Sequence, residues 1–441
     1  MSGEIKTTQE ILQKFGIEEL NSMQKSAAVS IIPNSDTVLL SPTGTGKTLA
    51  FLLPLVEMLD PEVKEVQAMI VVPSRELALQ IEQVFREMGS GFKANAVYGG
   101  RSIAKDRIEL EHLPALLIGT PGRLADHLRR EAFSTSEIKT LILDEFDKSL
   151  EVGFKDEMME IVFGLRNVMT RVLTSATQGL TVPNFVGLEK ETTINYLDQK
   201  LDQLKIEIVN SPSKDKLETL YNLLKHLGNE PGIVFCNFKD SIKRVSDFLS
   251  EKGIAHGCFF GGMEQKDRER ALIKFRNGTH KLLLATDLAA RGIDVNEIKF
   301  IIHYHLPVKS EEFTHRNGRT ARMNANGTAY VLKWNREDLP DFIKALNLKE
   351  LTLGEEEKSS KSETVAMTTL FVSGGRKDKI SKSDIAGLFF KQGGLVGNEL
   401  GVIEIKHDCT FVSVASAKAE KVIEELNNRR LKKKKVRVTK V

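Results

Sequence analysis

The sequence predicts an α/β protein with two tandem parallel-sheet domains, followed by a small α+β domain. Short apolar, β-rich runs alternate with amphipathic helical stretches over the first two-thirds of the chain. Such alternation is typical of parallel strands buried between layers of helices. The same pattern begins again after about residue 204, and a different one occupies the last 75 residues. These observations predict three folded domains.

The first domain, which we place at residues 1–203, shows the alternation clearly. Its β-rich runs include residues 38–40, 69–72, 116–118, 141–143 and 172–174. In open α/β sheets, ligands bind at the carboxyl ends of the strands. The polar motifs described below fall at those ends, so we expect the functional site there.

The second domain is expected at residues 204–350. Its predicted helices cover residues 214–227, 239–252 and 264–277, and its predicted strands include residues 232–236 and 282–285. A stretch rich in Glu, Lys and Ser at residues 354–362 then indicates a linker, placed at 351–366.

The last domain, residues 367–441, has a different order of elements. We expect strands at 370–373, 402–406, 410–414 and 436–439, and helices at 383–391 and 418–427. This βαββαβ order is typical of a small two-layer, RRM-like α+β domain.

Charge and cysteine content narrow the function classes. The formal net charge is only +3, but Arg429 to Lys440 contains eight Lys or Arg and no acidic residue, which suggests a local anionic partner. The three cysteines form no metal or redox pair, as in proteins of a reducing cytosol. The first ten residues contain no apolar signal core, and the run 49–59 is too short to span a bilayer. We therefore expect a cytoplasmic protein without a membrane partner.

A glycine-rich loop follows the first strand and opens a helix, and this context favours phosphate binding over a simple glycine turn. Glycines let backbone N–H groups surround phosphate oxygens, and the helix N-terminus adds positive charge. Lys47 is expected to pair with the β- and γ-phosphates of ATP, and Thr48 to bind Mg²⁺. The strict pattern has Gly where this chain has Ser41. The loop comprises Ser41, Pro42, Thr43, Gly44, Thr45, Gly46, Lys47 and Thr48.

The tetrad Asp144-Glu145-Phe146-Asp147, with three acidic residues, follows another apolar strand. Magnesium-dependent ATP hydrolysis needs an acidic group to hold the ion and a base to orient water. Asp144 suits the first role and Glu145 the second. A solvated acidic turn is the alternative, and the position at a strand end favours the functional interpretation.

Taken together, these motifs resemble the DEAD-box family of superfamily 2 RNA helicases over roughly residues 15–333. The resemblance implies two RecA-like domains, and RNA-stimulated ATP hydrolysis coupled to local unwinding or remodelling of RNA. The matching nucleotide motifs are Gln24 and residues 41–48, 144–147, 175–177, 287–294 and 315–322. The matching RNA motifs are residues 73–77, 98–100, 120–123, 235–238 and 265–268.

The resemblance also implies residue roles. Gln24 corresponds to the adenine-reading glutamine and Asp294 to the ribose contact. Arg319 and Arg322 correspond to arginine fingers supplied by the second domain, each worth about 10³–10⁵ in rate, so hydrolysis would require closure. Residues linking phosphate sensing to strand separation are Asp147, Ser175 and Thr177. Candidates for the RNA-backbone path are Arg75, Gly100, Thr120, Arg123, Arg268, Thr286 and Arg291; contacts of this kind give affinity without sequence choice.

The chain departs from the family pattern in several places. Phe146 replaces the usual Ala beside the catalytic carboxylates, and overpacking there would cost about 1–3 kcal/mol. In the adenine-binding segment, Ile17 replaces an aromatic residue, and Leu20 and Asn21 replace Pro-Thr, so adenine selectivity is expected to be looser. Milder changes are Ser74, Asn317 and Ala321.

Phe371 and Phe411 are predicted on adjacent central strands of the C-terminal sheet. Period-2 alternation directs Phe371 outward, where a sheet face can stack RNA bases. The alternative, that both rings are core, stays open because the full aromatic signature of an RRM is not present.

Alternation around Val436 and Val438 directs Lys433, Lys435 and Arg437 outward as a basic stripe. Solvated charge is the simpler interpretation, but a run without acids beside a helicase core favours RNA phosphate. The segments 374–378, 384–387 and 401–405, which include Arg376 and Lys377, resemble the RNA-binding domain of the DbpA branch. That resemblance implies a hairpin of ribosomal RNA and the maturing large subunit as partners.

Two other function classes remain to be weighed. An ATP-gated RNA clamp or chaperone would bind RNA with little unwinding, and the intact Glu145, Arg319 and Arg322 argue against it. A DNA helicase is disfavoured by the density of DEAD-box motifs.

Overall fold

The computed structural model describes residues 5–151, 153–177, 182–197, 204–287, 298–320, 326–353 and 366–441. The chain separates into two compact units, formed mainly by residues 1–202 and 203–441. Each unit is described by itself. The predictions at Arg291, Asp294 and Arg322, and most of the linker, fall outside the described residues.

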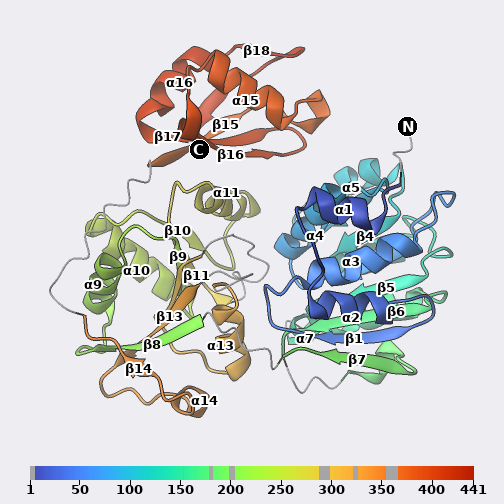
Figure 1. Ribbon diagram of the computed structural model, residues 1–441, viewed down its shortest axis with the longest axis horizontal. Helices are drawn as coiled ribbons and strands as arrows, with labels where there is room; N and C mark the ends of the chain where they lie inside the picture. Colours follow the sequence, from blue (N-terminus) through green and yellow to red (C-terminus); the bar gives the residue numbers. More distant parts are fainter. Residues whose placement is uncertain are drawn as a thin grey trace. The chain divides into compact units, whose positions relative to one another are not determined.

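The first unit contains a seven-stranded sheet in the order β3-β4-β2-β5-β6-β1-β7, with every pair parallel (Figure 1). Its strands are β1 (Asp36–Leu40), β2 (Ala68–Val71), β3 (Ala94–Val97), β4 (Leu116–Gly119), β5 (Thr140–Leu143), β6 (Thr170–Ser175) and β7 (Glu191–Asn195). Its helices are α1 (Thr8–Lys14), α2 (Ser22–Ser30), α3 (Lys47–Met58), α4 (Arg75–Met88), α5 (Ile103–Leu110), α6 (Pro121–Arg129), α7 (Phe146–Glu151) and α8 (Lys155–Gly164).

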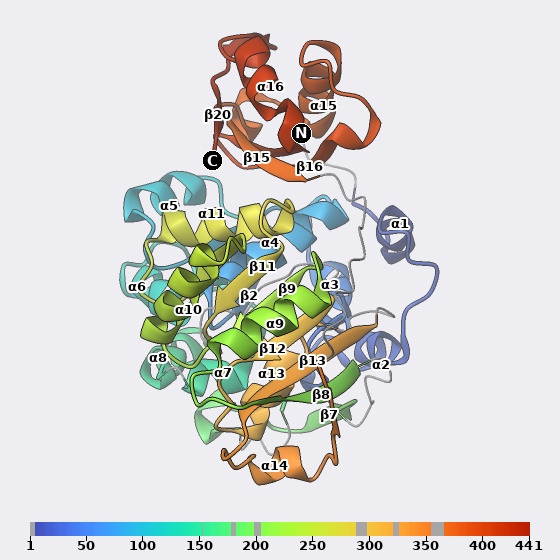
Figure 2. The same ribbon diagram turned by 90° about the vertical axis from the view of Figure 1, so that its left-hand side faces the viewer.

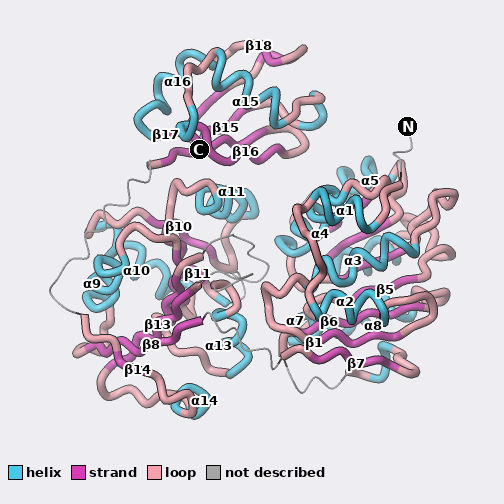
Figure 3. Tube along the Cα trace, viewed as in Figure 1, coloured by secondary structure: helices cyan, strands magenta, loops and turns pink. Residues whose placement is uncertain are grey.

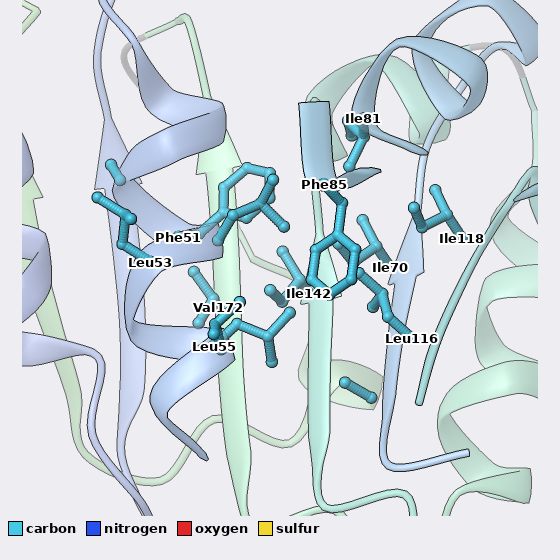
Figure 4. Close-up of a cluster of buried hydrophobic side chains, with 14 of the residues drawn as sticks. Phe51, Leu53, Leu55, Ile70, Ile81, Phe85, Leu116, Ile118, Ile142 and Val172 are labelled. Atoms are coloured by element: carbon cyan, nitrogen blue, oxygen red, sulfur yellow. The ribbon is translucent and has the colours of Figure 1, made fainter. Parts of the chain in front are cut away.

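Helices cover both faces of this sheet, which explains why its central strands read as continuous apolar runs. One hydrophobic cluster joins the sheet to α1–α4 and includes Phe51 and Phe85, which Figure 4 shows beside Ile142 and Val172. A second cluster on the other face joins the sheet to α5–α8. The sheet is thus held rigidly, with its carboxyl ends left for polar loops.

The second unit begins with another seven-stranded parallel sheet, in the order β10-β11-β9-β12-β13-β8-β14 (Figure 3). Counted from its own first strand, this is the same order as in the first unit. Its strands are β8 (Leu204–Ser211), β9 (Gly232–Phe235), β10 (His256–Phe259), β11 (Leu282–Ala285), β12 (Phe300–His303), β13 (Gly327–Trp334) and β14 (Lys349–Glu350). Its described helices are α9 (Leu217–Leu227), α10 (Lys239–Glu251), α11 (Gln265–Arg276), α13 (Ser310–Asn317) and α14 (Asp341–Lys344).

The C-terminal domain is an antiparallel sheet in the order β16-β17-β15-β20. Its strands are β15 (Met367–Val372), β16 (Leu400–Ile405), β17 (Thr410–Ala415) and β20 (Val438–Lys440). The two helices, α15 (Lys382–Lys391) and α16 (Ala419–Leu426), cover one face of the sheet (Figure 2). The predicted fold class, two parallel-sheet domains and a small α+β domain, is confirmed.

One detail of the C-terminal prediction is wrong. The last strand was expected at 436–439, but β20 begins at Val438, and residues 430–435 form a small hairpin of β18 (Arg430–Leu431) and β19 (Lys434–Lys435). Its turn includes Lys432 with a positive φ of 52°. Tight hairpins are usually signalled by Asn-Gly or similar pairs, so a lysine turn gave no sequence signal.

Candidate functional site

The glycine-rich loop joins β1 to α3, as the motif predicts. Gly44 and Gly46 have positive φ values of 85° and 89°, a conformation that glycine adopts without strain. The buried Lys47 ammonium donates to the carbonyl of Ser41. The hydroxyl groups of Ser41 and Thr45 lie 2.7 Å apart, in hydrogen-bond contact. The departure from glycine at position 41 therefore braces the loop.

The segment expected to read adenine is tied to this loop. Asn21 caps α2, accepting from the Gln24 backbone N–H at 2.9 Å, while the Asn21 side-chain amide donates to the Thr45 carbonyl at 3.0 Å. The Gln24 amide nitrogen lies 3.3 Å from the Gly46 carbonyl. A Cβ at Gly46 would come within 2.6 Å of that nitrogen. Although Asn21 departs from the family pattern, it serves as the N-cap of α2.

Asp144 and Glu145 lie at the carboxyl end of β5, both buried. Burial foremost, and then the charge of Glu145, raises the pKa of Asp144 to about 6, while Lys47 opposes the shift. Glu145 has φ of +47°, an unusual conformation for a non-glycine residue that costs about 1–3 kcal/mol and is common at active sites. The charges of these two buried carboxylates repel each other, and a divalent cation between the protein and a bound phosphate would relieve that repulsion.

Thr174, on the neighbouring strand β6, organises this pair, and the motif analysis missed it. Its hydroxyl donates to Asp144 Oδ1, and the Glu145 N–H donates to Thr174 Oγ1 at 3.2 Å. A signal was available, because Thr174 immediately precedes the expected Ser175 at the end of a strand. Since β6 pairs in parallel with β5, a side chain at this position lies next to the end of β5.

The structure brings together the three residues expected to couple phosphate sensing to strand separation. The Thr177 hydroxyl donates to Asp147 Oδ2 at 2.9 Å. Ser175 Oγ lies 3.1 Å from Thr177 Oγ1 and accepts from the Thr177 N–H at 3.0 Å. The acidic motif and the 175–177 segment are therefore directly linked.

Phe146 is fully buried and belongs to the hydrophobic cluster of α5–α8, together with Leu124, Met158 and Leu173. The domain core therefore provides the space that the bulky Phe146 side chain needs.

In the second unit, a buried arginine connects three strand ends. Arg316 donates to both carboxylate oxygens of Asp287 at 2.6 Å, to Asn237 Oδ1 at 2.8 Å and to the His305 carbonyl at 2.8 Å. Burial, and then the charge of Arg316, lowers the pKa of His303 to about 3. No role was predicted for Arg316, and its network anchors the segment that contains Arg319, an expected arginine finger. Arg319, three residues on, is buried.

The RNA-path candidates of the first unit follow the neighbouring strands β3, β4 and β2. A Cβ at Gly100 would lie 2.6 Å from Arg75 Nη1, so the Arg75 side chain packs over that glycine. Thr120 is the N-cap of α6, and Arg123 lies in its first turn. In the second unit, the Arg268 guanidinium lies 4.8 Å from the ring centroid of Phe259, and Thr286 directly follows β11.

Phe371 and Phe411 face each other across β15 and β17, with centroids 5.9 Å apart in a T-shaped arrangement. Neither belongs to the helix-facing core cluster of the C-terminal domain. On the same strands, Ser413 Oγ donates to the Asn277 carbonyl at 2.8 Å, and the Thr369 and Thr279 hydroxyls lie 2.7 Å apart. Residues after α11 therefore cover part of the face that was considered for base stacking.

The basic stripe has the predicted alternation. Lys433, Lys435 and Arg437 are exposed, and none of the ion pairs among the described residues involves them. Lys432, which precedes the stripe, pairs with Asp384 at 2.6 Å, and Lys434, between Lys433 and Lys435, pairs with Asp378 at 2.7 Å. Nearby, Arg376 and Lys377 are also exposed.

No cluster of three or more metal-ligating His, Cys, Asp or Glu side chains occurs in the described part of the chain. Mg²⁺ commonly uses one or two carboxylates together with substrate phosphates, so the set around Asp144 and Thr48 fits this ion. Over the same residues, no helix combines the length and apolar character required to cross a membrane.

Comparisons with known proteins identify the families that the three parts of the chain match. The DEAD/DEAH box helicase family matches residues 21–185, the helicase conserved C-terminal domain matches 215–324, and the DbpA RNA binding domain matches 369–440. The chain is 30% identical to ATP-dependent RNA helicase DbpA of Escherichia coli (strain K12), covering 97% of this chain and 95% of that protein. It is 29% identical to the Bacillus subtilis (strain 168) DbpA, with coverage of 97% and 96%.

Among solved structures, S. cerevisiae Dbp5 bound to RNA and ADP BeF3 is similar with a TM-score of 0.65 and 26% identity, covering 75% of this chain and 88% of that one. The chain therefore belongs to the DEAD-box family of ATP-dependent RNA helicases, which are ATP hydrolases. Within that family, its C-terminal domain and its similarity over nearly its whole length are those of the DbpA type.

Proposed function

We propose that this helicase locally separates or remodels short structured segments of ribosomal RNA during assembly of the large ribosomal subunit, in the cytoplasm. The observation that carries the proposal is the combination of an organised ATP site with a DbpA-type domain that exposes an unpaired basic stripe. The core meets RNA mainly through the phosphate backbone, which cannot select a sequence. The appended domain then supplies the selection.

In the proposed mechanism, the loop N–H groups and Lys47 hold the ATP phosphates, while Gln24 reads adenine. Thr48 and Asp144 would hold Mg²⁺, which neutralises phosphate charge when bound. Glu145 orients the attacking water, and its strained backbone fixes the carboxylate before substrate arrives. The remaining assigned groups are the ribose contact Asp294 and the fingers Arg319 and Arg322.

RNA recognition divides between the core and the C-terminal domain. The core path comprises Arg75, Gly100, Thr120, Arg123, Arg268, Thr286 and Arg291. In the C-terminal domain, we assign hairpin binding to the basic stripe Lys433, Lys435 and Arg437, with Arg376 and Lys377, rather than to the partly covered sheet face. Lys432 and Lys434, which are paired internally, hold the stripe in place.

The test is to change Lys433, Lys435 and Arg437 together to Gln in the full chain. The RNA concentration for half-maximal ATPase activity should rise for an rRNA hairpin but change little for unstructured RNA. The salt dependence of hairpin binding should flatten by about 0.7–0.9 per lost phosphate contact. The matched control neutralises three exposed lysines on or beside the helices, Lys391, Lys418 and Lys421. An equal loss in both triple variants would exclude the stripe.

The competing function, an ATP-gated RNA clamp, predicts a different result with the unchanged protein. A helicase releases one strand of a short two-stranded duplex with repeated ATP turnover. A clamp retains the duplex and needs only ATP binding. Retention of the duplex with ATP as well as with a non-hydrolysable analogue would favour the clamp.

A further inference from the structure

A buried carboxylate lies between the two RNA-path loops of the first domain. Asp106, on α5, is fully buried. Arg123 Nη1 lies 3.2 Å and His127 Nε2 3.1 Å from its Oδ2, and Arg101 Nε lies 3.3 Å from its Oδ1. Three side chains from two other segments thus converge on one carboxylate that the ATP site does not use.

The position of Asp106 has a counterpart in the second domain. Gly99-Gly100 follow β3, and Gly261-Gly262 follow β10, the corresponding edge strand. Asp106 is six residues after Gly100, and Arg268 is six residues after Gly262. The second domain therefore places a cation, itself an RNA-path candidate, where the first domain places a carboxylate. Because a carboxylate repels phosphate and this one is buried, Asp106 acts through its partners.

Arg123 is the main partner, and its guanidinium is committed inside the protein. One terminal nitrogen contacts Asp106, and the other donates to the Arg101 carbonyl at 2.5 Å. Its side chain is only 9% exposed. Arg123 therefore joins the start of α6 to the loop that contains Gly100, over which Arg75 packs.

We propose that Asp106 is a positioning residue for RNA binding, which holds the 99–101 loop and the 120–123 turn in register through Arg123. Arg123 is then an anchor and not a phosphate contact. This inference rests on the proposed RNA path through Arg75, Gly100 and Thr120, and it changes the role of Arg123 within that path.

The experiment measures RNA-stimulated ATPase activity of the full chain with unstructured RNA, for Asp106→Asn, Arg123→Gln and the double variant. We expect each single change to raise the half-maximal RNA concentration by about tenfold or more, with kcat at saturating RNA and the KM for ATP nearly unchanged. The double variant should lose no more than the worse single variant, because both changes break one contact. The slope of RNA affinity against salt should stay the same.

A direct phosphate contact by Arg123 predicts the opposite: additive losses, and a salt slope for Arg123→Gln lower by about 0.7. Arg123→Lys distinguishes anchoring from a phosphate contact independently of Asp106, so the test still works if Asp106→Asn does not fold. Lysine keeps the charge but cannot bridge two acceptors in a fixed fork. Anchoring predicts weakened RNA binding for Arg123→Lys, and a phosphate contact predicts nearly normal binding.

Two controls separate this inference from other failures. Asp36 is a buried carboxylate at the amino-terminal end of β1, 3.5 Å from Arg171, so Asp36→Asn should lower the melting temperature and leave RNA affinity unchanged. If Asp36→Asn weakened RNA binding as much as Asp106→Asn, general destabilisation would be the cause and the inference would fail. If Arg75→Ala left RNA affinity intact, the proposed RNA path itself would be wrong. If Arg75→Ala lowered RNA affinity but Asp106→Asn did not, only the positioning role of Asp106 would be overturned.

Discussion

The two α/β domains share one scaffold but carry different chemistry at its carboxyl edge. Their strand orders are the same when each is counted from its first strand, and an aromatic residue with two glycines follows the third strand in both. A threonine directly follows the fourth strand in each, Thr120 after β4 and Thr286 after β11. The shared fold therefore places the proposed RNA-path residues at equivalent positions in both domains, while function depends on the loops.

The first loop shows the difference most clearly. Ser41-Pro42 after β1 leads into left-handed glycines and Lys47, whereas Ser211-Pro212 at the end of β8 leads to Lys216 without a glycine. Lys216 is buried and donates to the Leu332 carbonyl at 2.9 Å and to Glu337 at 3.2 Å. Burial lowers its pKa. Lys216 thus makes contacts within its own domain. Of these two loops, only the one after β1 has the glycines and the lysine that suit phosphate binding.

The largest expected effect tests whether the second domain contributes charge to the first. If Arg319 is a finger, Arg319→Ala should lower kcat by about 10³–10⁵ and change nucleotide affinity much less. Single-turnover hydrolysis and nucleotide titration measure the two effects. Arg244→Ala, an exposed arginine paired with Asp215, is the control and should hydrolyse ATP normally. A finger role is excluded if the two variants have similar kcat.

The next effect belongs to the first domain alone. If Glu145 is the base that orients water, Glu145→Gln should reduce turnover by about 10²–10⁴, while ATP and RNA still bind. RNA-stimulated phosphate release measures this loss. Glu207→Gln removes a buried carboxylate of the second domain and should leave turnover intact. Near-normal hydrolysis by Glu145→Gln would refute the assignment.

A smaller effect is expected at Thr174, which organises the carboxylates. Thr174→Val removes a hydroxyl from a buried carboxylate, at a cost of about 1–3 kcal/mol in unfolding free energy, and should also reduce kcat. Thr170, at the other end of β6, accepts a hydrogen bond from the Asn34 N–H at 3.0 Å and is also buried. Thr170→Val should lower the melting temperature without lowering kcat. Equal kcat in both variants would mean that Thr174 is only structural.

Most of the site was predictable because its motifs are local in the sequence. The glycine loop, the acidic run and the 175–177 segment each lie at a strand end that apolar patterning reveals. What the sequence did not show are partners from other elements: Thr174 across a strand pair, Arg316 across three strand ends, and Asp106 beneath two loops. Such contacts depend on tertiary packing, which a one-dimensional pattern does not contain.

The smallest effect concerns the response of the two domains to acid. Burial foremost lowers the pKa of His303 to about 3 and of His305 to about 4. As pH falls below about 6.5, the unfolded chain gains protons that the folded second domain does not, so the stability of this domain decreases toward pH 4. The decrease is up to about 1.4 kcal/mol per pH unit for the fully buried His303 and smaller for His305, which solvent partly screens. Asp144 has the opposite sign, because its raised pKa makes the nucleotide-free first domain less stable as pH rises from about 4 to about 6.

Amide exchange along β12 and β5 between pH 6.5 and 4 would follow the two domains separately. Protection of β12 should decrease with falling pH, and that of β5 should change less or increase. His303→Leu removes one titrating group, so it should flatten the pH dependence at β12 whatever its effect on the absolute stability. The decisive quantity is therefore the slope of β12 protection against pH, and not the protection at any one pH. An unchanged slope in His303→Leu would show that burial of this histidine is not the source of acid sensitivity.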